Sequence, residues 1–355
     1  MLESPSPIGR LRADGAPRTL GLALGRAGRR AVHEHLLPSA DWAAVMAPSH
    51  RGHLARMADT TRRHFPAIWA ELEGLAEGLG LALESVFAWN CRGDLLASVP
   101  DGCTTLVVPG NRPLIAHNED GLPCLRGHCF LFEATPGQGS GFTAFCYPGS
   151  LPGHTLAITR GGLVQAVNNL RLRGVAPDVP RMVLGRAVLD QPGLDEALAL
   201  LRRHPGSGGF HFTLAAPGGG QIVSVEFGGG EVSVRPVEVP RVHANHALHH
   251  RRGLASQVIT ASSADRQRRG EALIDAGILA PLAILHDRQP AGLPILRLDP
   301  DDPDHENTLA TAVFEPGPDG VAWRLYDRPD AAPAHAGFHP HHAAGRGAGT
   351  PSCRS

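Results

Sequence analysis

Gly102 and Cys103 are the residues with the clearest chemical potential, at the point where helical sequence gives way to strand-like sequence. A glycine leaves its carbonyl uncrowded, so the sulfur of Cys103 can attack its own preceding peptide bond and form a thioester. Hydrolysis then frees Cys103 as a new N-terminus, whose α-amine has an ordinary pKa of about 7.7 to 8.0 and can act as a base. The sequence therefore predicts self-cleavage before Cys103. The alternative is a structural cysteine after a turn glycine, because free cysteine is among the most buried residue types.

Three polar residues elsewhere in the chain suit acyl transfer by a thiol. Asp120 follows the apolar residues 113–116, and a hairpin there brings its carboxylate beside the start of the Cys103 strand, where it can orient the amine. The side-chain amide of Asn245 can donate to a developing oxyanion. Arg266, near the start of an expected helix, can lower the pKa of the thiol or bind an acyl carboxylate.

Metal chemistry has weaker support. The histidines of residues 243–250 suit a strand that ends at an exposed loop, and no carboxylate lies near them in the sequence. The acidic residues in 299–306 are interrupted by proline and lack the central glycine of a calcium loop. We therefore predict no metal and no cofactor, although a metal-dependent amidase built on residues 243–250 stays a third interpretation. Nucleophile-elbow, phosphate-loop and zinc-helix motifs do not occur.

The composition excludes several classes of protein. The chain has 355 residues, and its 33 basic and 34 acidic side chains nearly cancel, so neither nucleic acid nor an anionic membrane surface is expected as a partner. No run of 18 apolar residues occurs, and residues 1–18 lack the apolar centre of a signal peptide, so we expect a cytoplasmic protein. The six cysteines form no C-x-x-C pair and are expected to be thiols.

The elements that would position these residues change in type along the chain. Helices are predicted over residues 21–36, 54–65, 67–80 and 83–96, and in 67–80 the apolar residues have the three-to-four spacing of a helical face. After Cys103, short β-branched and aromatic runs predict strands over 104–108, 113–117, 129–134, 142–147, 156–159 and 163–167. Helices over 182–189 and 194–203 precede alternating strands within 210–234. Ser263 is expected to cap a helix over 264–276, and residues 308–314 and 321–326 form a closing hairpin. Residues 331–355 are expected to be disordered.

Several of these motifs together resemble one known family, the isopenicillin N acyltransferase family of N-terminal-nucleophile hydrolases. The resemblance covers about residues 21–327. Its motifs occur in the family's order and are Leu72-Glu73-Gly74-Leu75-Ala76-Glu77-Gly78, Asp101-Gly102-Cys103-Thr104-Thr105, His117-Asn118-Glu119-Asp120-Gly121, Asn245 between histidines, Ser262-Ser263 with Arg266, and residues 308–314.

The resemblance implies an α+β fold, a four-layer αββα sandwich with a helical N-terminal segment. Residues 1–102 would be released as a small chain that stays associated with the core, residues 103–330. By similarity Cys103 is the nucleophile, Asp120 positions its amine, Asn245 is an oxyanion donor, and Arg266 supports the site and the cleavage. The substrate- and oxyanion-binding residues implied are Asn118, Glu119, Asn169 and His246. Asn169 matches a position in related bile-salt hydrolases. Glu119, where the fungal acyltransferase has an aromatic residue, and His246-Ala247 depart from the family pattern and are expected to line the substrate pocket.

The predicted activity is that of an amidohydrolase or acyltransferase acting on small N-acyl amides or aminoacyl conjugates through a Cys103 thioester. Acyl-coenzyme A is an allowed co-substrate, although no residue marks a site for it. The main alternative is an uncleaved, catalytically idle binding protein of the same fold. The free α-amine distinguishes the enzyme from the idle binding protein, because without cleavage Cys103 has no base of its own.

Overall fold

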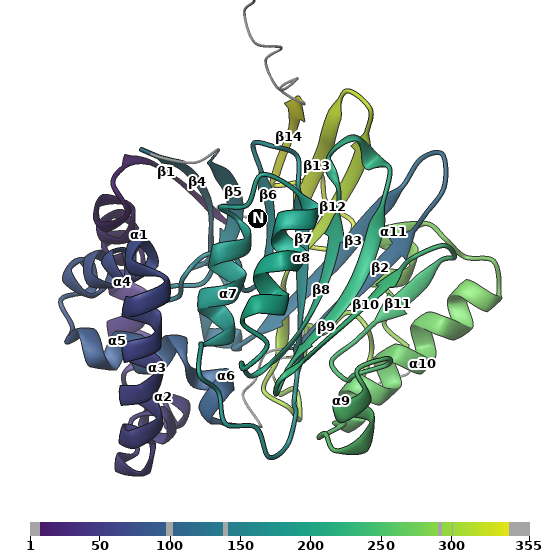
Figure 1. Cartoon of the computed structure of the whole chain (residues 1–355). Helices are drawn as coiled ribbons and strands as arrows, with labels where there is room; N and C mark the ends of the chain where they lie inside the picture. The colour runs from purple at the N-terminus through teal and green to yellow at the C-terminus, as the bar shows by residue number, and fades with distance from the viewer. Residues whose placement is uncertain (1–7, 97–101, 138–140, 290–292, 300, 341–355) are drawn as a thin grey trace, which may run out of the picture.

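The computed structural model describes residues 8–96, 102–137, 141–289, 293–299 and 301–340, and it is a mixed α+β fold with two sheets (Figure 1). The first, sheet A, has eight strands. In spatial order they are β1 (Gly9–Gly15), β4 (Phe130–Pro136), β5 (Phe142–Cys146), β6 (Leu156–Thr159), β7 (Val164–Leu170), β8 (Gly209–Ala215), β9 (Ile222–Gly228) and β10 (Glu231–Pro236). The second, sheet B, has six. They are β11 (Arg241–His243), β2 (Gly102–Val108), β3 (Leu114–Gly121), β12 (Asn307–Gly317), β13 (Gly320–Tyr326) and β14 (His335–Pro340).

The helices form three groups. Those before Cys103 are α1 (Pro17–Ala31), α2 (Ala40–Val45), α3 (Arg51–His64), α4 (Pro66–Leu79), α5 (Leu83–Asn90) and α6 (Arg92–Leu95). Between β7 and β8 lie α7 (Arg181–Val188) and α8 (Leu194–Arg203), and after β11 lie α9 (Arg251–Ala255), α10 (Ala261–Asp275) and α11 (Pro281–Leu285). Helices α10 and α11 contact β11, β2 and β3 of sheet B, whereas α7 and α8 lie over sheet A (Figure 1).

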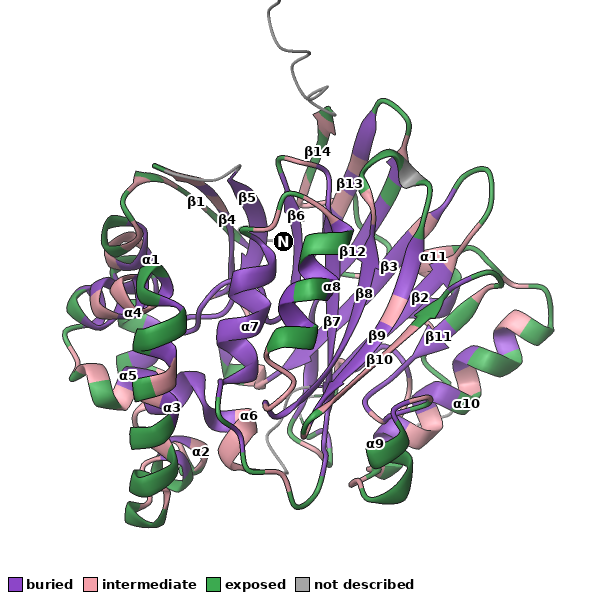
Figure 2. Cartoon of the chain, viewed as in Figure 1, coloured by how far each residue is buried: buried purple, intermediate pink, exposed green. Residues whose placement is uncertain are grey.

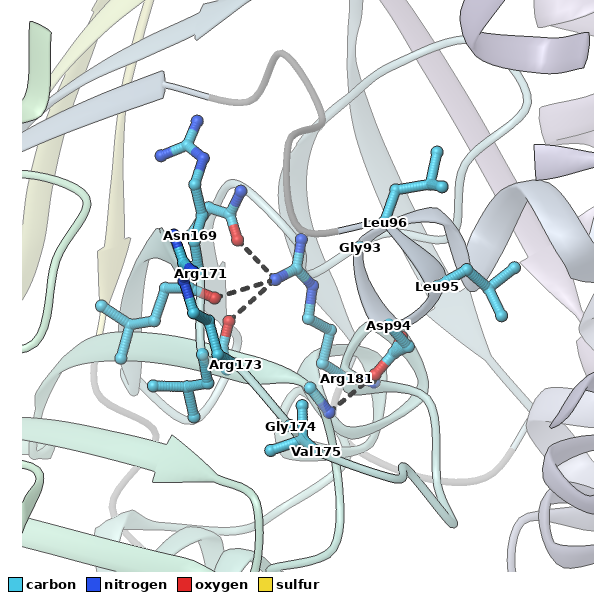
Figure 3. A pocket seen from close by; sticks show the side chains of 14 residues that line it. Gly93, Asp94, Leu95, Leu96, Asn169, Arg171, Arg173, Gly174, Val175 and Arg181 are labelled. Carbon is cyan, nitrogen blue, oxygen red and sulfur yellow. Dashed lines mark hydrogen bonds between the residues drawn. The ribbon is translucent and has the colours of Figure 1, made fainter. Parts of the chain in front are cut away.

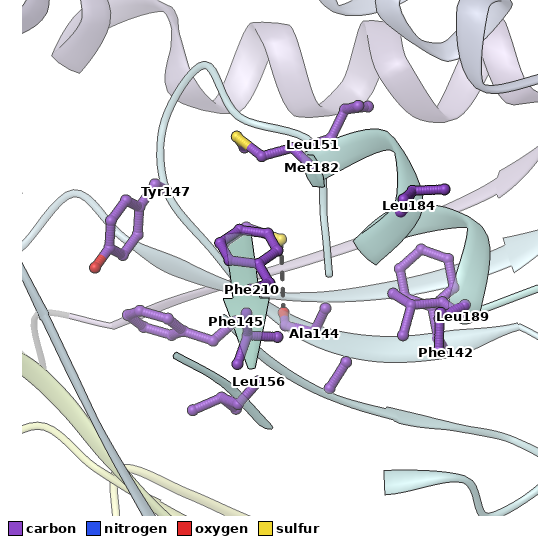
Figure 4. Packing of buried hydrophobic residues seen from close by; sticks show 14 of the residues in the cluster. Phe142, Ala144, Phe145, Tyr147, Leu151, Leu156, Met182, Leu184, Leu189 and Phe210 are labelled. Atoms are coloured by element: carbon purple, nitrogen blue, oxygen red, sulfur yellow. Dashed lines mark hydrogen bonds between the residues drawn. The ribbon is translucent and has the colours of Figure 1, made fainter. Parts of the chain in front are cut away.

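The main hydrophobic core includes buried residues from both sheets and from the helices that cover sheet A. Burial is continuous through the central strands, as Figure 2 shows. Within this core Phe142, Phe145 and Phe210 of sheet A belong to the same cluster as Met182 and Leu184 of α7 (Figure 4). Removing so much apolar surface from water is the main favourable term in folding.

Helices α1 and α4 pack at very short range through glycines. A Cβ atom on Gly21 would lie 1.9 Å from the carbonyl oxygen of Glu71, and one on Gly74 would lie 2.0 Å from that of Arg18. Glycines at Gly25 and Gly78 continue the contact one turn along. Glycine disfavours a helix when only local sequence is considered, yet here the missing side chains allow the two backbones to meet.

Three expectations need correction. The predicted disordered tail, 331–355, contains strand β14, which pairs with β13, and Gly337 allows this pairing because a Cβ there would lie 2.7 Å from the Trp323 ring. Helix α10 begins at Ala261 and is capped by Thr260, whose hydroxyl accepts from the backbone N–H of Ser263 at 3.2 Å, so Ser263 is not the cap. The N-terminal segment is not only helical, because β1 pairs in parallel with β4.

The described cysteines are free thiols, and Cys124 is exposed while the others are buried. In the described parts of the chain, no helix combines the length and the apolar character that crossing a bilayer requires.

Candidate active site

Strands β2 and β3 form the hairpin that carries most of the predicted chemistry. Their antiparallel register pairs Gly102 with Asp120 and Cys103 with Glu119. Asp120 therefore lies beside the start of the Cys103 strand, as the sequence predicted. Because side chains alternate between the two faces of a strand, the hairpin divides its polar residues into two sets.

One set points towards sheet A, and we call this side of the hairpin the thiol face. Its members are Cys103, Thr105, His117 and Glu119. Thr105 donates a hydrogen bond to Asn168 Oδ1 on β7 at 2.7 Å, and the hydroxyl of Tyr147 donates to Glu119 Oε1 at 2.7 Å. The thiol face is therefore covered by sheet A.

The other set points towards α10 and α11, and we call this side the helix face. Arg266 of α10 donates to Thr104 Oγ1 at 3.0 Å, and Asn118 Nδ2 donates to the carbonyl oxygen of Leu285 at 2.7 Å. Asp120 lies on the same face. Its Oδ1 accepts from the Thr308 hydroxyl at 2.6 Å. Burial raises the pKa of Asp120, and the charge of Arg266 opposes that shift.

The backbone of Cys103 is held at both of its polar atoms. Its N–H donates to Asn245 Oδ1 at 2.8 Å, and its carbonyl oxygen accepts from Arg266 Nη1. Arg266 Nη2 also donates to Asn245 Oδ1, at 2.7 Å, which fixes the amide orientation of Asn245. Asn245 Nδ2 donates in turn to the carbonyl oxygen of Asn169 at 3.2 Å. Asn245 and Arg266, two predicted site residues, therefore hold the backbone of the residue that self-cleavage would make the new N-terminus, and we call this pair the clamp.

The Cys103 side chain is buried and faces a carboxyl group. Its Sγ donates to Glu119 Oε2 at 3.7 Å, and His117 Nε2 lies 3.0 Å from the same oxygen. Burial lowers the pKa of His117 to about 3, so its imidazole is neutral near pH 7.

A chain of donors and acceptors shows where one proton lies. Asn168 Nδ2 donates to the carbonyl oxygen of His243, which turns Asn168 Oδ1 towards Thr105. Because Thr105 donates to that oxygen, its hydroxyl accepts from His117 Nδ1–H at 2.8 Å. Nε2 of the neutral ring is then an acceptor, so the contact between His117 Nε2 and Glu119 Oε2 requires one shared proton. That proton lies beside the thiol.

On the helix face, Glu306 meets the start of β2. A Cβ atom on Gly102 would lie 2.3 Å from Glu306 Oε2, so glycine is the residue that fits there. Glu306 is held by Arg297 at 2.8 Å and faces Arg171 at 3.6 Å. Burial raises its pKa to about 7 although Arg297 opposes the shift. The acidic stretch 299–306 thus surrounds a buried arginine, since Arg297 also pairs with Asp302.

Comparison with known proteins places the chain in a family. Residues 107–330 match the family model described as acyl-coenzyme A:6-aminopenicillanic acid acyl-transferase. The chain belongs to this acyltransferase family. It is also 28% identical over 159 residues to the beta-alanyl-dopamine/carcinine hydrolase of Drosophila melanogaster, a match that covers 39% of this chain and 41% of that protein. The chain thus spans about two fifths of that relative's length, and the family match begins four residues after Cys103.

In this member of the acyltransferase family, Asn169 lies at a cavity of about 230 Å³ beside the clamp (Figure 3). Arg181 donates to Asn169 Oδ1 and, at 2.9 Å, to the carbonyl oxygen of Gly209. A Cβ on Gly93 would lie 1.6 Å from Arg181 Nη2, so Gly93 leaves room for the guanidinium. The cavity is basic, because Arg171 and Arg173 also line it.

Two predicted substrate-contacting residues have their polar atoms in contacts with other parts of the protein. Asn118 is on the helix face, where its Oδ1 accepts from the Thr311 hydroxyl at 2.6 Å and its Nδ2 donates to the carbonyl oxygen of Leu285 in α11. This placement does not favour a substrate contact for Asn118. His246 Nδ1 contacts the Ser263 hydroxyl at 2.8 Å, and the same hydroxyl accepts from the backbone N–H of Asn245. His246 therefore helps to position the loop that carries Asn245.

The histidines of residues 243–250 surround a carboxylate from sheet A. Glu226 accepts from the backbone N–H groups of Leu248 and His249 at 2.6 and 2.8 Å, and His243 Nε2 lies 2.9 Å from it. Although burial opposes the shift, the hydrogen bond and charge of His243 lower the pKa of Glu226 to about 2. The sequence showed no nearby carboxylate because Glu226 lies on a different strand. Its bonds fix the loop before α9.

Sequence reasoning missed several residues around the site. His117, Thr105 and Tyr147 line the thiol face. On the helix face Glu306 meets Gly102, and Arg297 holds Glu306. A signal existed for His117, because it lies two positions before Glu119 in one strand and therefore shares its face. Thr105 had the same kind of signal, two positions after Cys103 in its strand, whereas Tyr147, Arg297 and Glu306 come from distant parts of the chain.

Proposed function

We propose that this chain is a self-processing amide hydrolase or acyltransferase whose nucleophile is Cys103. The observation that carries the proposal is the clamp on the backbone N–H and carbonyl oxygen of Cys103, formed by Asn245 and Arg266 beside a buried thiol. A structural cysteine needs no such pair of charged and amide side chains on its backbone. Membership of the acyltransferase family gives the same reaction class.

The first reaction would be cleavage of the chain. The Cys103 sulfur loses its proton and attacks the carbonyl carbon of Gly102, the C–N bond breaks, and the Cys103 nitrogen takes up a proton. Water then hydrolyses the thioester and leaves a carboxylate on Gly102. The new amine keeps Asn245 Oδ1 as an acceptor, and Asp120, opposite Gly102 in the hairpin, supplies the carboxylate that orients it.

Turnover would use the same atoms on an external amide. The amine of Cys103 takes the proton of the thiol, and the thiolate attacks the substrate carbonyl while an oxyanion develops near Asn245 and Asn169. The ammonium then protonates the leaving nitrogen as the C–N bond breaks. A thioester remains, and its acyl group is then transferred to water or to a second amine, which frees the thiol. Small N-acyl amides and aminoacyl conjugates are the substrate class, which fits a relative named for hydrolysis of a β-alanyl amide. Acyl-coenzyme A stays an allowed donor for the transfer reaction.

Buried polar contacts support the proposal that both fragments stay together after cleavage. Glu71 of α4 and Arg186 of α7 are both buried and form an ion pair at 2.9 Å. Asn90 of α5 accepts from the backbone N–H of Leu151, and Asp94 of α6 accepts from that of Gly208. The helices on the outer sides of the two sheets likewise support a four-layer αββα arrangement.

The direct test is the mass of the freshly purified, denatured protein. Scaling the 37.4 kDa chain by residue number predicts fragments of about 11 and about 27 kDa, the larger beginning at Cys103. Cys103→Ala should give one uncleaved chain without amidase activity, whereas Cys124→Ser, at the exposed thiol, should behave as wild type. Cleavage that persists in Cys103→Ala would refute the mechanism.

A stable single chain in the wild type would instead support the idle binding protein. Activity should be assayed on β-alanyl amides with and without a chelator. Loss of activity on chelation would support the metal-dependent alternative, and retained activity would exclude it.

A further inference from the structure

Cys103, His117 and Glu119 place three different metal-binding atoms close together, and we call these residues the thiol cluster. Cys103 Sγ lies 3.7 Å from Glu119 Oε2, and His117 Nε2 lies 3.0 Å from that oxygen. All three donor atoms lie within 4.8 Å of one another, and the side chains are buried. In the described part of the chain, this is the one group of three such residues that meets this geometry.

These distances are close to those of a zinc site. Tetrahedral Zn²⁺ with bonds of about 2.3 Å to sulfur and about 2.0 to 2.2 Å to nitrogen and oxygen separates its ligand atoms by about 3.3 to 3.6 Å. The observed sulfur–oxygen separation of 3.7 Å lies just above that range, and the nitrogen–oxygen separation of 3.0 Å lies a few tenths of an ångström below it. We propose that the thiol cluster binds one zinc ion, with Cys103, His117 and Glu119 as its ligands.

The surroundings already orient the ligands as a metal requires. The hydroxyl of Tyr147 donates to Glu119 Oε1 at 2.7 Å and leaves Oε2 turned towards the thiol. Thr105 contacts His117 Nδ1 at 2.8 Å and leaves Nε2 turned towards Glu119. Groups that hold the far side of a ligand in this way fix its orientation in metal sites. The ion would replace the proton shared by His117 and Glu119, and that proton and the thiol proton would leave to solvent.

The consequence for activity rests on the proposed function of Cys103. Coordination to zinc lowers the nucleophilicity of a thiolate and holds the sulfur in place, so zinc would inhibit both self-cleavage and turnover. In the cleaved protein, the amine and sulfur of Cys103 would form a five-membered chelate and complete four ligands. The mature form should therefore bind zinc more tightly than the uncleaved chain, and a chelator should restore its activity.

Cobalt(II) is the probe, because it takes zinc sites and a thiolate ligand gives it a charge-transfer absorption band. Titration of the full chain, in a Cys124→Ser background that removes the exposed thiol, should give this band at one equivalent, and zinc should bleach it. His117→Gln and Glu119→Gln should each weaken binding at least tenfold. His249→Gln is the matched control, because His249 faces the other histidine-rich site, at Glu226; it should bind as the parent does.

Two outcomes would overturn the inference. One is cobalt binding without a thiolate band. The other is binding that survives His117→Gln but is lost in His249→Gln. Cys103→Ser tests the ligand in another way, because it should keep the circular dichroism spectrum but lose the band. Absence of cleavage with a normal cobalt band would refute only the proposed function. Normal cleavage and turnover without a band would refute only the zinc site.

Discussion

Adding a single methyl group at Gly102 should slow self-cleavage. The Cβ of Gly102→Ala would lie 2.3 Å from Glu306 Oε2, 3.0 Å from Glu306 Cδ and 3.3 Å from Asp120 Cβ. Glu306 cannot move away freely, because it is buried and bound to Arg297 at 2.8 Å. The methyl group therefore has to displace either the carboxylate or the peptide that is to be cleaved.

The size of the effect follows from the overlap. Extra carbon atoms in a well-packed interior cost about 1 to 3 kcal/mol. If this cost falls on the transition state for cleavage, the rate drops roughly 5- to 150-fold, since about 1.36 kcal/mol corresponds to a factor of ten. Gly137→Ala is a matched control, because a Cβ there meets nothing closer than 3.7 Å.

The assay is denatured mass against time after synthesis in a cell-free system, which records cleavage before purification. Gly102→Ala should accumulate the uncleaved chain while Gly137→Ala cleaves at the wild-type rate. Adding Glu306→Ala to Gly102→Ala removes the overlapping carboxylate and should recover part of the rate. Cleavage of Gly102→Ala at the wild-type rate would refute the reasoning, and so would a slow variant that Glu306→Ala leaves unchanged.

Three further predictions concern residues that the structure ties to the site. Burial raises the pKa of Glu306 in the folded chain to about 7. Between about pH 4.5 and 7 the folded chain therefore binds more protons than the unfolded chain, and the free energy of unfolding falls as the pH rises. The test compares the urea unfolding of uncleaved Cys103→Ala with that of the double variant Cys103→Ala/Glu306→Gln. The free energy of unfolding of Cys103→Ala minus that of the double variant should fall by up to about 3 kcal/mol across that window; a difference that does not change with pH would contradict this. Arg186→Met leaves Glu71 buried without this partner and should lower the free energy of unfolding by about 3 to 5 kcal/mol; a loss below about 1 kcal/mol would argue against a buried pair. Asn245→Asp keeps the acceptor for the Cys103 N–H but removes the donor, so cleavage should persist while kcat falls about 100- to 1,000-fold; equal effects on both reactions would refute that separation.

Much of the hairpin at the centre of the site could be predicted from the sequence. The runs 104–108 and 113–117 indicated two strands, and the polar residues after them had to return beside Cys103. Strand β3 nevertheless continues to Gly121, because β12 pairs with it on the other side. That pairing places Asp120 inside a strand, and no pattern in the sequence near Asp120 predicts the pairing with β12.

The missed residues outside the hairpin come from contacts between distant segments. Glu306 meets Gly102 although about two hundred positions separate them, and its own surroundings in the sequence suggested only an acidic loop. Strand β14 was missed for a related reason. Its Ala, Gly and His composition is typical of a disordered tail, and its order depends on pairing with β13 and on Trp323.

The two faces of the hairpin suggest why one site could serve both reactions. Asn245 and Arg266 bind the backbone N–H and carbonyl oxygen of Cys103, so these contacts do not depend on whether Gly102 is still attached. The side chain of Cys103 is on the opposite face, where His117 and Glu119 hold a proton next to the sulfur. Cleavage would therefore change what is bonded to the Cys103 nitrogen without moving the clamp. For turnover, Asn245 Nδ2 must exchange the carbonyl oxygen of Asn169, now 3.2 Å away, for an oxyanion. That exchange is the one rearrangement of the clamp that the proposed mechanism requires.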